Sequence, residues 1–215
     1  MRKLLVIAGL AMAMAGSAGA EGIEFWAMFG QTLMNNGGLG SNLCAAGELC
    51  LGASPNDVSL ADGFHFGFRG GFNTGEHLGY EMGYMYNRTK LQFNNPTAVA
   101  EAGLTGTQTS EGMAYHQVAF NALYYFTGTD SRFRPFGTAG LGFTNYAQPG
   151  SSAAYGGGTT ELGFNYGGGV KIRLTPRFGV RVDVRQSTTP KPFGFPMASG
   201  WLRENEFSVG FGVLF

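Results

Sequence analysis

The chain has 215 residues, of which 13% are charged and 14% aromatic, and 37 are glycines. Its 14 basic and 14 acidic side chains cancel, which argues against nucleic-acid binding because no basic face is indicated. The composition also excludes a disordered charged tail and favours strands joined by tight turns. Beyond the N-terminus no apolar run reaches the roughly 18 residues that a membrane-spanning helix needs.

The N-terminus is predicted to be a secretory signal peptide. Arg2 and Lys3 precede an apolar run that ends near Ala15, and small residues follow as far as Ala20. A charged segment, a short apolar segment and an A-x-A site predict cleavage after Ala20. The alternative, a buried helix, is disfavoured because glycine and serine would end it poorly. We therefore expect the first 20 residues to be removed and residues 21–215 to form one domain.

Cys44 and Cys50 are the two cysteines of the chain, and they lie in a stretch rich in glycine, asparagine and serine. Export places them in an oxidising compartment, where such a pair can close a small loop as a disulfide. A metal site is the alternative, but no histidine lies near them and a closed zinc site needs four ligands. We predict the disulfide, and we expect neither a metal site nor a cofactor.

The mature chain can be divided into eight stretches of about 10 to 14 residues, most of which alternate apolar with small or polar residues as β-strands do. In the clearest, phenylalanines at positions 64, 66, 68 and 72 alternate with small or polar residues. The stretches include residues 23–33, 64–73, 78–87, 117–126, 134–146, 161–174, 178–185 and 206–215. The first and the fifth are less regular than the others.

The connections between these stretches alternate in length. Short connections rich in glycine, aspartate, proline and threonine lie at residues 73–76, 127–133 and 175–177, and longer ones lie at 34–60, 94–113, 147–160 and 188–203. In an antiparallel meander all the long loops emerge at one end. An even strand count with this asymmetry is typical of bacterial outer-membrane barrels. The sequence therefore predicts an all-β, eight-stranded antiparallel up-and-down transmembrane barrel in the outer membrane.

Alternation alone does not say whether the apolar face contacts lipid or a protein core, so a soluble barrel and a β-sandwich are alternatives. The other face is mainly small residues with a few charges of both signs, which suits a narrow interior where charges must pair. The predicted interior charge cluster is Arg69, Glu81, Lys171, Arg173, Arg181, Asp183, Arg185 and Glu206. We interpret it as a salt-bridged plug, with a gated polar conduit as the alternative.

Tyrosines and tryptophans near the ends of the stretches are interpreted as the aromatic girdles that lie at the two membrane interfaces. They are Trp26, Tyr84, Tyr86, Tyr115, Tyr124, Tyr146, Tyr166 and Trp201. Aromatic-rich strands also occur in soluble cores, so this pattern supports the membrane barrel without deciding it.

The three histidines do not form a recognisable catalytic motif. His65 and His77 fall on the predicted interior face, and His116 lies near the start of a strand. None is followed two residues later by serine, as in barrels that deacylate lipid A. We predict no enzymatic activity and no catalytic residues; an enzyme acting on lipid A or peptides at the outer rim is a less favoured alternative.

Two segments carry a resemblance to a known family. Residues 134–143 read RPFGTAGLGF, and residues 167–185 read GGGVKIRLTPRFGVRVDVR. With the export signal and the terminal Phe215, the chain resembles the OmpA-like family of eight-stranded outer-membrane β-barrels over essentially all of residues 21–215. Full-length OmpA-like proteins add a peptidoglycan-binding domain, for which nothing remains after Phe215, so we do not expect cell-wall tethering.

The resemblance also implies partners and a role. In this family a terminal aromatic residue preceded by alternating apolar residues is read by the barrel-assembly machinery. The matching residues here are Phe207, Val209, Phe211, Val213 and Phe215. Periplasmic chaperones, outer-membrane lipid and lipopolysaccharide are implied likewise, with a monomeric barrel expected. The expected function is a non-enzymatic structural or surface-interaction role, and a small diffusion pore or transporter for small or apolar molecules is the alternative.

Overall fold

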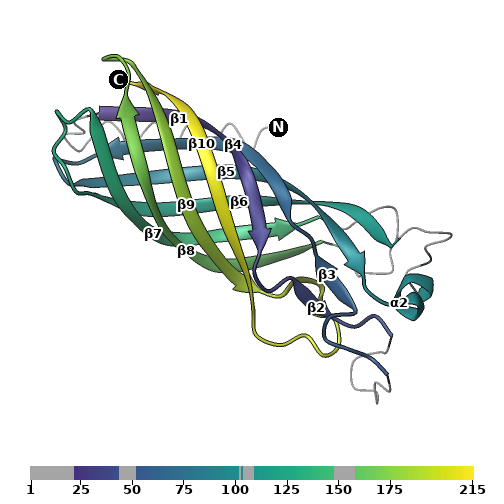
Figure 1. Cartoon of the computed structure of the whole chain (residues 1–215). Helices are drawn as coiled ribbons and strands as arrows, with labels where there is room; N and C mark the ends of the chain where they lie inside the picture. Colours follow the sequence, from purple (N-terminus) through teal and green to yellow (C-terminus); the bar gives the residue numbers. More distant parts are fainter. Residues whose placement is uncertain (1–21, 44–51, 102, 104–108, 148–157) are drawn as a thin grey trace, which may run out of the picture.

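Eight long antiparallel strands form a closed barrel in the computed structural model, which describes residues 22–43, 52–101, 103, 109–147 and 158–215 (Figure 1). The strands are β1 (Gly22–Met34), β4 (Gly63–Asn73), β5 (Leu78–Phe93), β6 (Ser110–Tyr125), β7 (Phe133–Tyr146), β8 (Thr159–Arg173), β9 (Phe178–Pro190) and β10 (Trp201–Leu214). Each pairs with the next along the chain, and β10 pairs with β1. Closure leaves the eight-stranded wall without a free edge, as a strand-built membrane protein requires. The predicted fold is confirmed.

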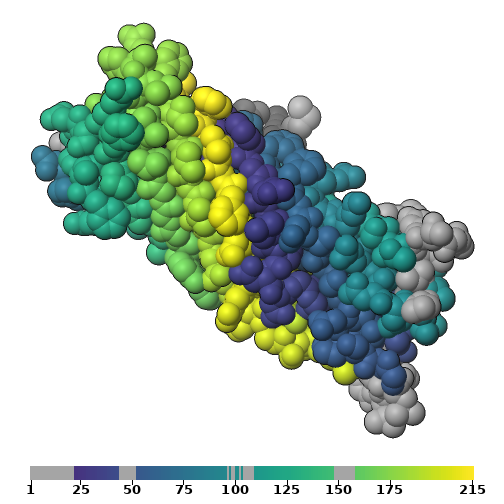
Figure 2. All heavy atoms as spheres, in the orientation of Figure 1, coloured from purple at the N-terminus to yellow at the C-terminus, as the bar shows by residue number. Residues whose placement is uncertain are grey.

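The first and last strands meet at the end of the barrel that carries the short turns. The backbone N–H of Phe215 donates to the carbonyl of Ile23 at 2.9 Å, and β1 lies beside β10 along the barrel wall (Figure 2). In outer-membrane barrels this end faces the periplasm and the opposite end, with the long loops, faces outward. We call the two ends the turn end and the loop end.

The strands extend further at the loop end than the alternation predicted. β6 begins at Ser110, β9 continues to Pro190 and β10 begins at Trp201, so the loops predicted at 94–113 and 188–203 are shorter. Outward-facing polar residues, including Ser110, Arg203 and Asn205, occur in these extensions beside the exposed Trp201, because strands that rise beyond the lipid no longer need a wholly apolar outer face.

Short elements occupy the long loops. β2 (Gly38–Gly40) pairs with β3 (Val58–Leu60), and β3 adds to the edge of β5 beyond the barrel. A helical turn, α2 (Pro96–Glu101), follows β5, and a 3-10 turn, η2 (Pro192–Gly194), follows β9. Three-residue strands carry no readable periodicity, so the sequence did not reveal them.

Two predictions lie outside the described residues: the signal peptide at residues 1–20 and the pair Cys44 and Cys50. Within the described part of the chain, no helix has the length and apolar character needed to cross a membrane.

The outer wall of the barrel is apolar and the inner wall is polar. Phe66 and Phe211 are about half exposed, whereas Arg69 and Asp183 are at most 2% exposed. A soluble barrel would have the opposite distribution, because its core must be dry and its surface must be hydrated. The apolar outer wall therefore matches a lipid-facing surface.

The predicted aromatic girdle is only partly correct. Tyr84, Tyr124, Tyr166 and Trp201 are exposed on the outer wall, and Tyr86 is half-buried there. Trp26, Tyr115 and Tyr146 instead lie inside the barrel, each at most 1% exposed. Their positions in the alternation place them on the inner face, where large rings help to fill the ends of the lumen.

Candidate functional site in the barrel lumen

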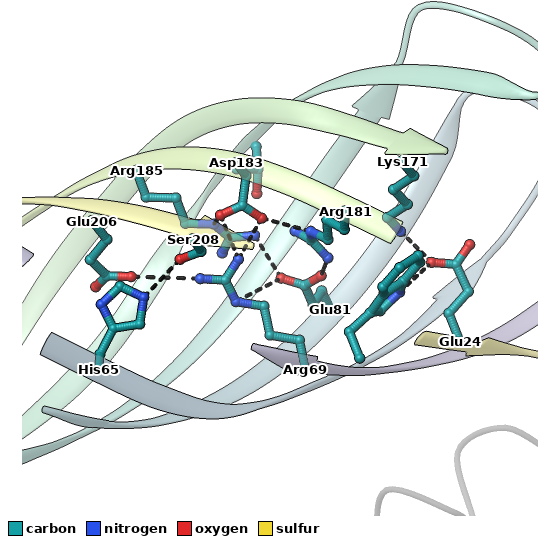
Figure 3. Close-up of polar contacts among 12 residues, drawn as sticks. Glu24, His65, Arg69, Glu81, Lys171, Arg181, Asp183, Arg185, Glu206 and Ser208 are labelled. Atoms are coloured by element: carbon teal, nitrogen blue, oxygen red, sulfur yellow. Dashed lines mark hydrogen bonds and ion pairs between the residues drawn. The ribbon is translucent and has the colours of Figure 1, made fainter. Parts of the chain in front are cut away.

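A group of charged side chains meets in the lumen (Figure 3). They are Arg69 from β4, Glu81 from β5, Arg181, Asp183 and Arg185 from β9, and Glu206 from β10, and none is more than 5% exposed. The three residues of β9 share one face because side chains alternate along a strand. We call these six residues the central network.

Each arginine of the central network contacts at least one carboxylate. Arg69 Nη1 lies 2.7 Å from one oxygen of Asp183, and its Nη2 lies 3.5 Å from Glu206 Oε2. Arg181 donates through Nε to Asp183 at 2.6 Å and through Nη1 to Glu81. Three guanidinium groups therefore face three carboxylates, which leaves the network neutral, as burial of charge requires.

Arg185 completes the network from the loop end of β9. Its Nη2 donates to Glu81 at 2.7 Å, so Glu81 accepts from two arginines at once. Charge-assisted hydrogen bonds of this kind are roughly twice as strong as neutral ones. The network thus links four strands across the lumen and holds their inner faces together.

Lys171 lies apart from the central network, nearer the turn end. Its Nζ donates to Glu24 and, at 2.6 Å, to the hydroxyl of Tyr125, while Trp26 Nε1 donates to Glu24 at 3.0 Å. Glu24 was not among the predicted interior charges, because its strand alternates less regularly. Ile23, Phe25 and Phe29 face outward. Because side chains alternate along a strand, these apolar residues could have placed Glu24 on the inner face.

Arg173 does not join either group of charges. It is half-buried at the turn end, and its Nη2 donates to the carbonyl of Thr129 at 2.5 Å. Arg134, which the sequence did not single out, is 5% exposed and stacks 3.8 Å from the centre of the Tyr125 ring. The alternation predicts whether a side chain faces the lumen or the lipid. It does not predict how far along the barrel axis the charged end of that side chain lies.

A second polar layer lies between the central network and the loop end. Glu204 accepts hydrogen bonds from Tyr115 Oη at 2.6 Å and from Gln117 Nε2. The predicted strand began at Glu206, so Glu204 was missed although it has the same parity. This layer ties β6 to β10 across the lumen.

Apolar side chains close the lumen at the loop end. The buried members of this cluster are Leu39, Val58, Leu60, Leu91, Phe93, Met113, Tyr115, Tyr146 and Leu202. Phe193 and Phe195, from the connection between β9 and β10, pack against it. We call it the loop-end cluster.

The space left in the lumen is small. A cavity of about 30 Å³ lies beside the central network, between Arg185 and Glu206 on one side and Ala119, Gly142 and Gly163 on the other. A second, of about 20 Å³, lies near Glu24 and Lys171. Because one water needs about 10 to 15 Å³ by this measure, each cavity has room for only one or two waters.

Comparison with known proteins identifies the family. The family model for the outer membrane protein beta-barrel domain matches residues 4–215. The chain belongs to this family. This membership and the barrel fold confirm the predicted outer-membrane location and the predicted family resemblance.

Two solved structures share the fold of this outer-membrane barrel. OprG from Pseudomonas aeruginosa is 14% identical with a TM-score of 0.65, and the match covers 92% of this chain and 97% of that one. The N-terminal β-barrel domain of OprF from Pseudomonas aeruginosa is also 14% identical, with a TM-score of 0.52 and coverage of 91% and 98%. No curated protein matches the chain. At this identity the likeness shows the fold alone.

The histidines of the barrel occupy three different environments. His65 lies in the lumen, where its ring nitrogens contact Thr32 Oγ1 at 3.0 Å and Ser208 Oγ at 2.8 Å. His116 lies on the outer wall and contacts Tyr84 Oη at 2.8 Å. The interior position expected for His77 is wrong: the residue lies in the turn after β4, with about half of its side chain exposed.

The pair Ser208 and His65 has the spacing of a nucleophile and a base but lacks the rest of a hydrolase site. A catalytic triad needs a third group, ordinarily a carboxylate, to orient the imidazole, and here the second ring nitrogen contacts the hydroxyl of Thr32. Both residues are at most 2% exposed. Among the described residues, no three histidine, cysteine or acidic side chains are placed to hold a metal ion.

Proposed function

We propose that the protein is a non-enzymatic, non-conducting barrel of the outer membrane, which anchors its long loops at the cell surface for structure or for contact with a surface partner. The observation that carries this proposal is the filled lumen. The central network, the Glu204 layer and the loop-end cluster succeed one another along the barrel axis, and the two cavities found among the described residues have room for one or two waters each.

An open path would require the central network to separate. Removing one partner from a buried ion pair costs about 3 to 5 kcal/mol, because the other charge is left uncompensated. Arg181 contacts both Glu81 and Asp183, so moving it leaves the three carboxylates of the central network with only two guanidinium groups. The loop-end cluster adds a second, apolar barrier to hydrated ions.

Planar-bilayer recording tests this proposal. The refolded wild-type barrel is expected to show no unitary conductance above background. The double variant Arg69→Ala/Asp183→Ala removes one cation and one anion, keeps the network neutral and empties the centre of the lumen, so openings are expected to increase. Boiled and unboiled SDS gels check that both proteins are folded. Unitary openings of the wild-type barrel would overturn the proposal.

Transport of small apolar molecules is the second candidate, and the apolar loop-end cluster favours it. Such a molecule would have to displace Phe193 and Phe195 from their contacts with the cluster. Uptake of an apolar tracer into vesicles that contain the barrel would support transport. Equal uptake by vesicles with and without the barrel would favour the structural role.

We also propose that the last strand carries the signal for barrel assembly. Phe207, Phe211 and Phe215 project outward, with Phe215 79% exposed, so the alternating side chains are accessible at the barrel seam. Phe215→Ser is expected to lower the yield of folded barrel several-fold without changing export. Equal yields of heat-modifiable barrel from the variant and the wild type would contradict this role.

A further inference from the structure

Four basic side chains gather at the turn end, where β7 and β8 lie side by side. Arg134 of β7 lies directly opposite Lys171 of β8 in the sheet register. Nearer the turns, the backbone N–H of Arg173 donates to the carbonyl of Arg132 at 2.8 Å, so these two residues are also neighbours. Like charges that face each other on adjacent strands destabilise a sheet. The arrangement therefore needs negative charge nearby.

The carboxylate of Glu24 lies among these cations, and one of them already uses it. Lys171 Nζ donates to Glu24, and the two form a pair that is separate from the central network (Figure 3). Among the described residues, no acidic oxygen lies within the 4.0 Å limit for an ion pair of Arg132, Arg134 or Arg173. Three guanidinium groups therefore share the turn end without a carboxylate partner in the described part of the chain.

Arg134 is the most deeply buried of these three arginines. Only 5% of the residue is exposed, and its guanidinium stacks 3.8 Å from the centre of the Tyr125 ring. Its Nη2 donates to the backbone carbonyl of Glu76 at 3.1 Å, whereas its Nε has no hydrogen-bond partner among the described residues. Burying a cation is costly unless an anion compensates it. An anion beside Arg134 would offset that cost and accept the free Nε–H.

A cavity of about 20 Å³ lies against all four basic side chains, and Glu24 and Ser131 also line it. Arg132 is exposed and Arg173 is half-buried, so the rim of the cavity meets the solvent at the turn end. One water needs about 10 to 15 Å³ by this measure. A chloride ion is slightly larger than a water molecule, so the cavity has room for one chloride. Phosphate and organic acids are too large for it.

We propose that Arg132, Arg134 and Arg173 bind a chloride ion in this cavity. A water molecule would accept the hydrogen bond of Arg134 Nε, but it would leave four cations facing the single charge of Glu24. A chloride reduces that excess, and hydrogen bonds between charged groups are stronger than those between neutral ones. The site opens at the turn end, so it does not depend on whether the lumen conducts.

Urea unfolding of the refolded barrel in maltoside micelles, followed by gel mobility, tests the proposal. The wild type is compared in sodium chloride and in sodium gluconate at equal ionic strength, because gluconate screens surface charge equally but is too large for the cavity. A ligand that binds only the folded state raises its stability with ligand concentration. We therefore expect the urea midpoint of the wild type to be higher in chloride and to rise with chloride concentration.

Variants of the basic side chains assign this chloride response to the cavity. Arg134→Gln is expected to lose most of the response. Arg173→Gln, which changes a half-buried residue at the rim, is expected to reduce it and serves if Arg134→Gln folds poorly. The matched control is Arg177→Gln, which removes an exposed arginine of the turn end that is not part of the cavity lining. This control is expected to keep the full response.

Two further measurements test the place and the size of the ion. Bromide, which is close to chloride in size, is expected to give an anomalous diffraction peak beside Arg134 Nε in crystals of the wild type. In sodium phosphate, the wild type and Arg134→Gln are expected to show the same change of midpoint. Equal chloride responses of these two proteins, loss of the response in Arg177→Gln, a bromide-free cavity, or a phosphate response that requires Arg134 would each overturn the proposal.

Discussion

The two halves of the inner wall are built from opposite kinds of residue. β4, β5, β9 and β10 provide the long charged side chains of the central network, and we call them the charged half. β6, β7 and β8 provide mainly glycine, alanine, asparagine and threonine at the same levels, and we call them the small half. An eight-stranded barrel is only wide enough for side chains to fill it. A long side chain from one half therefore needs a small residue in the other half.

Glycines also accompany the charges within neighbouring strands. Gly167 and Gly169 of β8 pair in register with Arg185 and Asp183 of β9. A Cβ at Gly167 would lie 3.0 Å from Arg185 Cγ, and one at Gly169 would lie 2.5 Å from Asp183 Cβ. The glycines thus allow the charged side chains to reach across the lumen, and the charged half depends on the small half.

Removing a charge from the centre is expected to have the largest effect. Arg181→Met leaves two guanidinium groups facing the three buried carboxylates of the central network, so the free energy of unfolding should fall by about 3 to 5 kcal/mol. Urea unfolding in lipid vesicles, followed by gel mobility, measures the change. Arg177→Met, at an exposed arginine of the turn end, should change stability by less than about 0.5 kcal/mol. A loss below about 1 kcal/mol for Arg181→Met would mean that the network does not stabilise the charged half.

Enlarging a residue in the small half is expected to have an intermediate effect. A side chain at Gly167 would overlap the carbonyl oxygen of Val184 and crowd Arg185, so Gly167→Leu should destabilise the barrel by about 1 to 3 kcal/mol. Gly70→Ala is the control, because nothing lies within 4 Å of a Cβ at that position. The same unfolding assay compares the two variants. Equal stabilities would show that the lumen tolerates bulk on its small side.

The sequence predicted the inward face of the central network because the period of a strand is two residues. Arg69, Glu81 and Arg181 follow this period in regular stretches. The pairing of these charges was not predictable, because the level of each side chain depends on the stagger between strands in the closed barrel. Arg173, which has the same parity as Lys171, lies at the turn end for this reason.

The two ends of the lumen were less accessible to sequence reasoning than its centre. Leu39 and Val58 of the loop-end cluster come from strands of three residues, which are too short to show a period. Tyr115 and Tyr146 were assigned to the membrane interface by residue type, although their parity places them inside. For these two tyrosines the prediction from residue type was wrong, whereas the alternation gave the correct inner face.

Asn121 offers the mildest test of the contrast between the two halves. It lies in the small half, lines the cavity of about 30 Å³, and has neither side-chain amide atom hydrogen-bonded to protein. Asn121→Leu keeps the number and branching of the side-chain heavy atoms, adds bulk that the adjoining cavity can take, and removes two unsatisfied polar atoms. Stability should therefore stay within about 1 kcal/mol of the wild type and rise if the cavity is dry. The urea assay distinguishes the outcomes. A larger loss would mean that Asn121 hydrogen-bonds to a water in the cavity that also hydrogen-bonds to the charged half. The small half would then contribute hydrogen bonds as well as space.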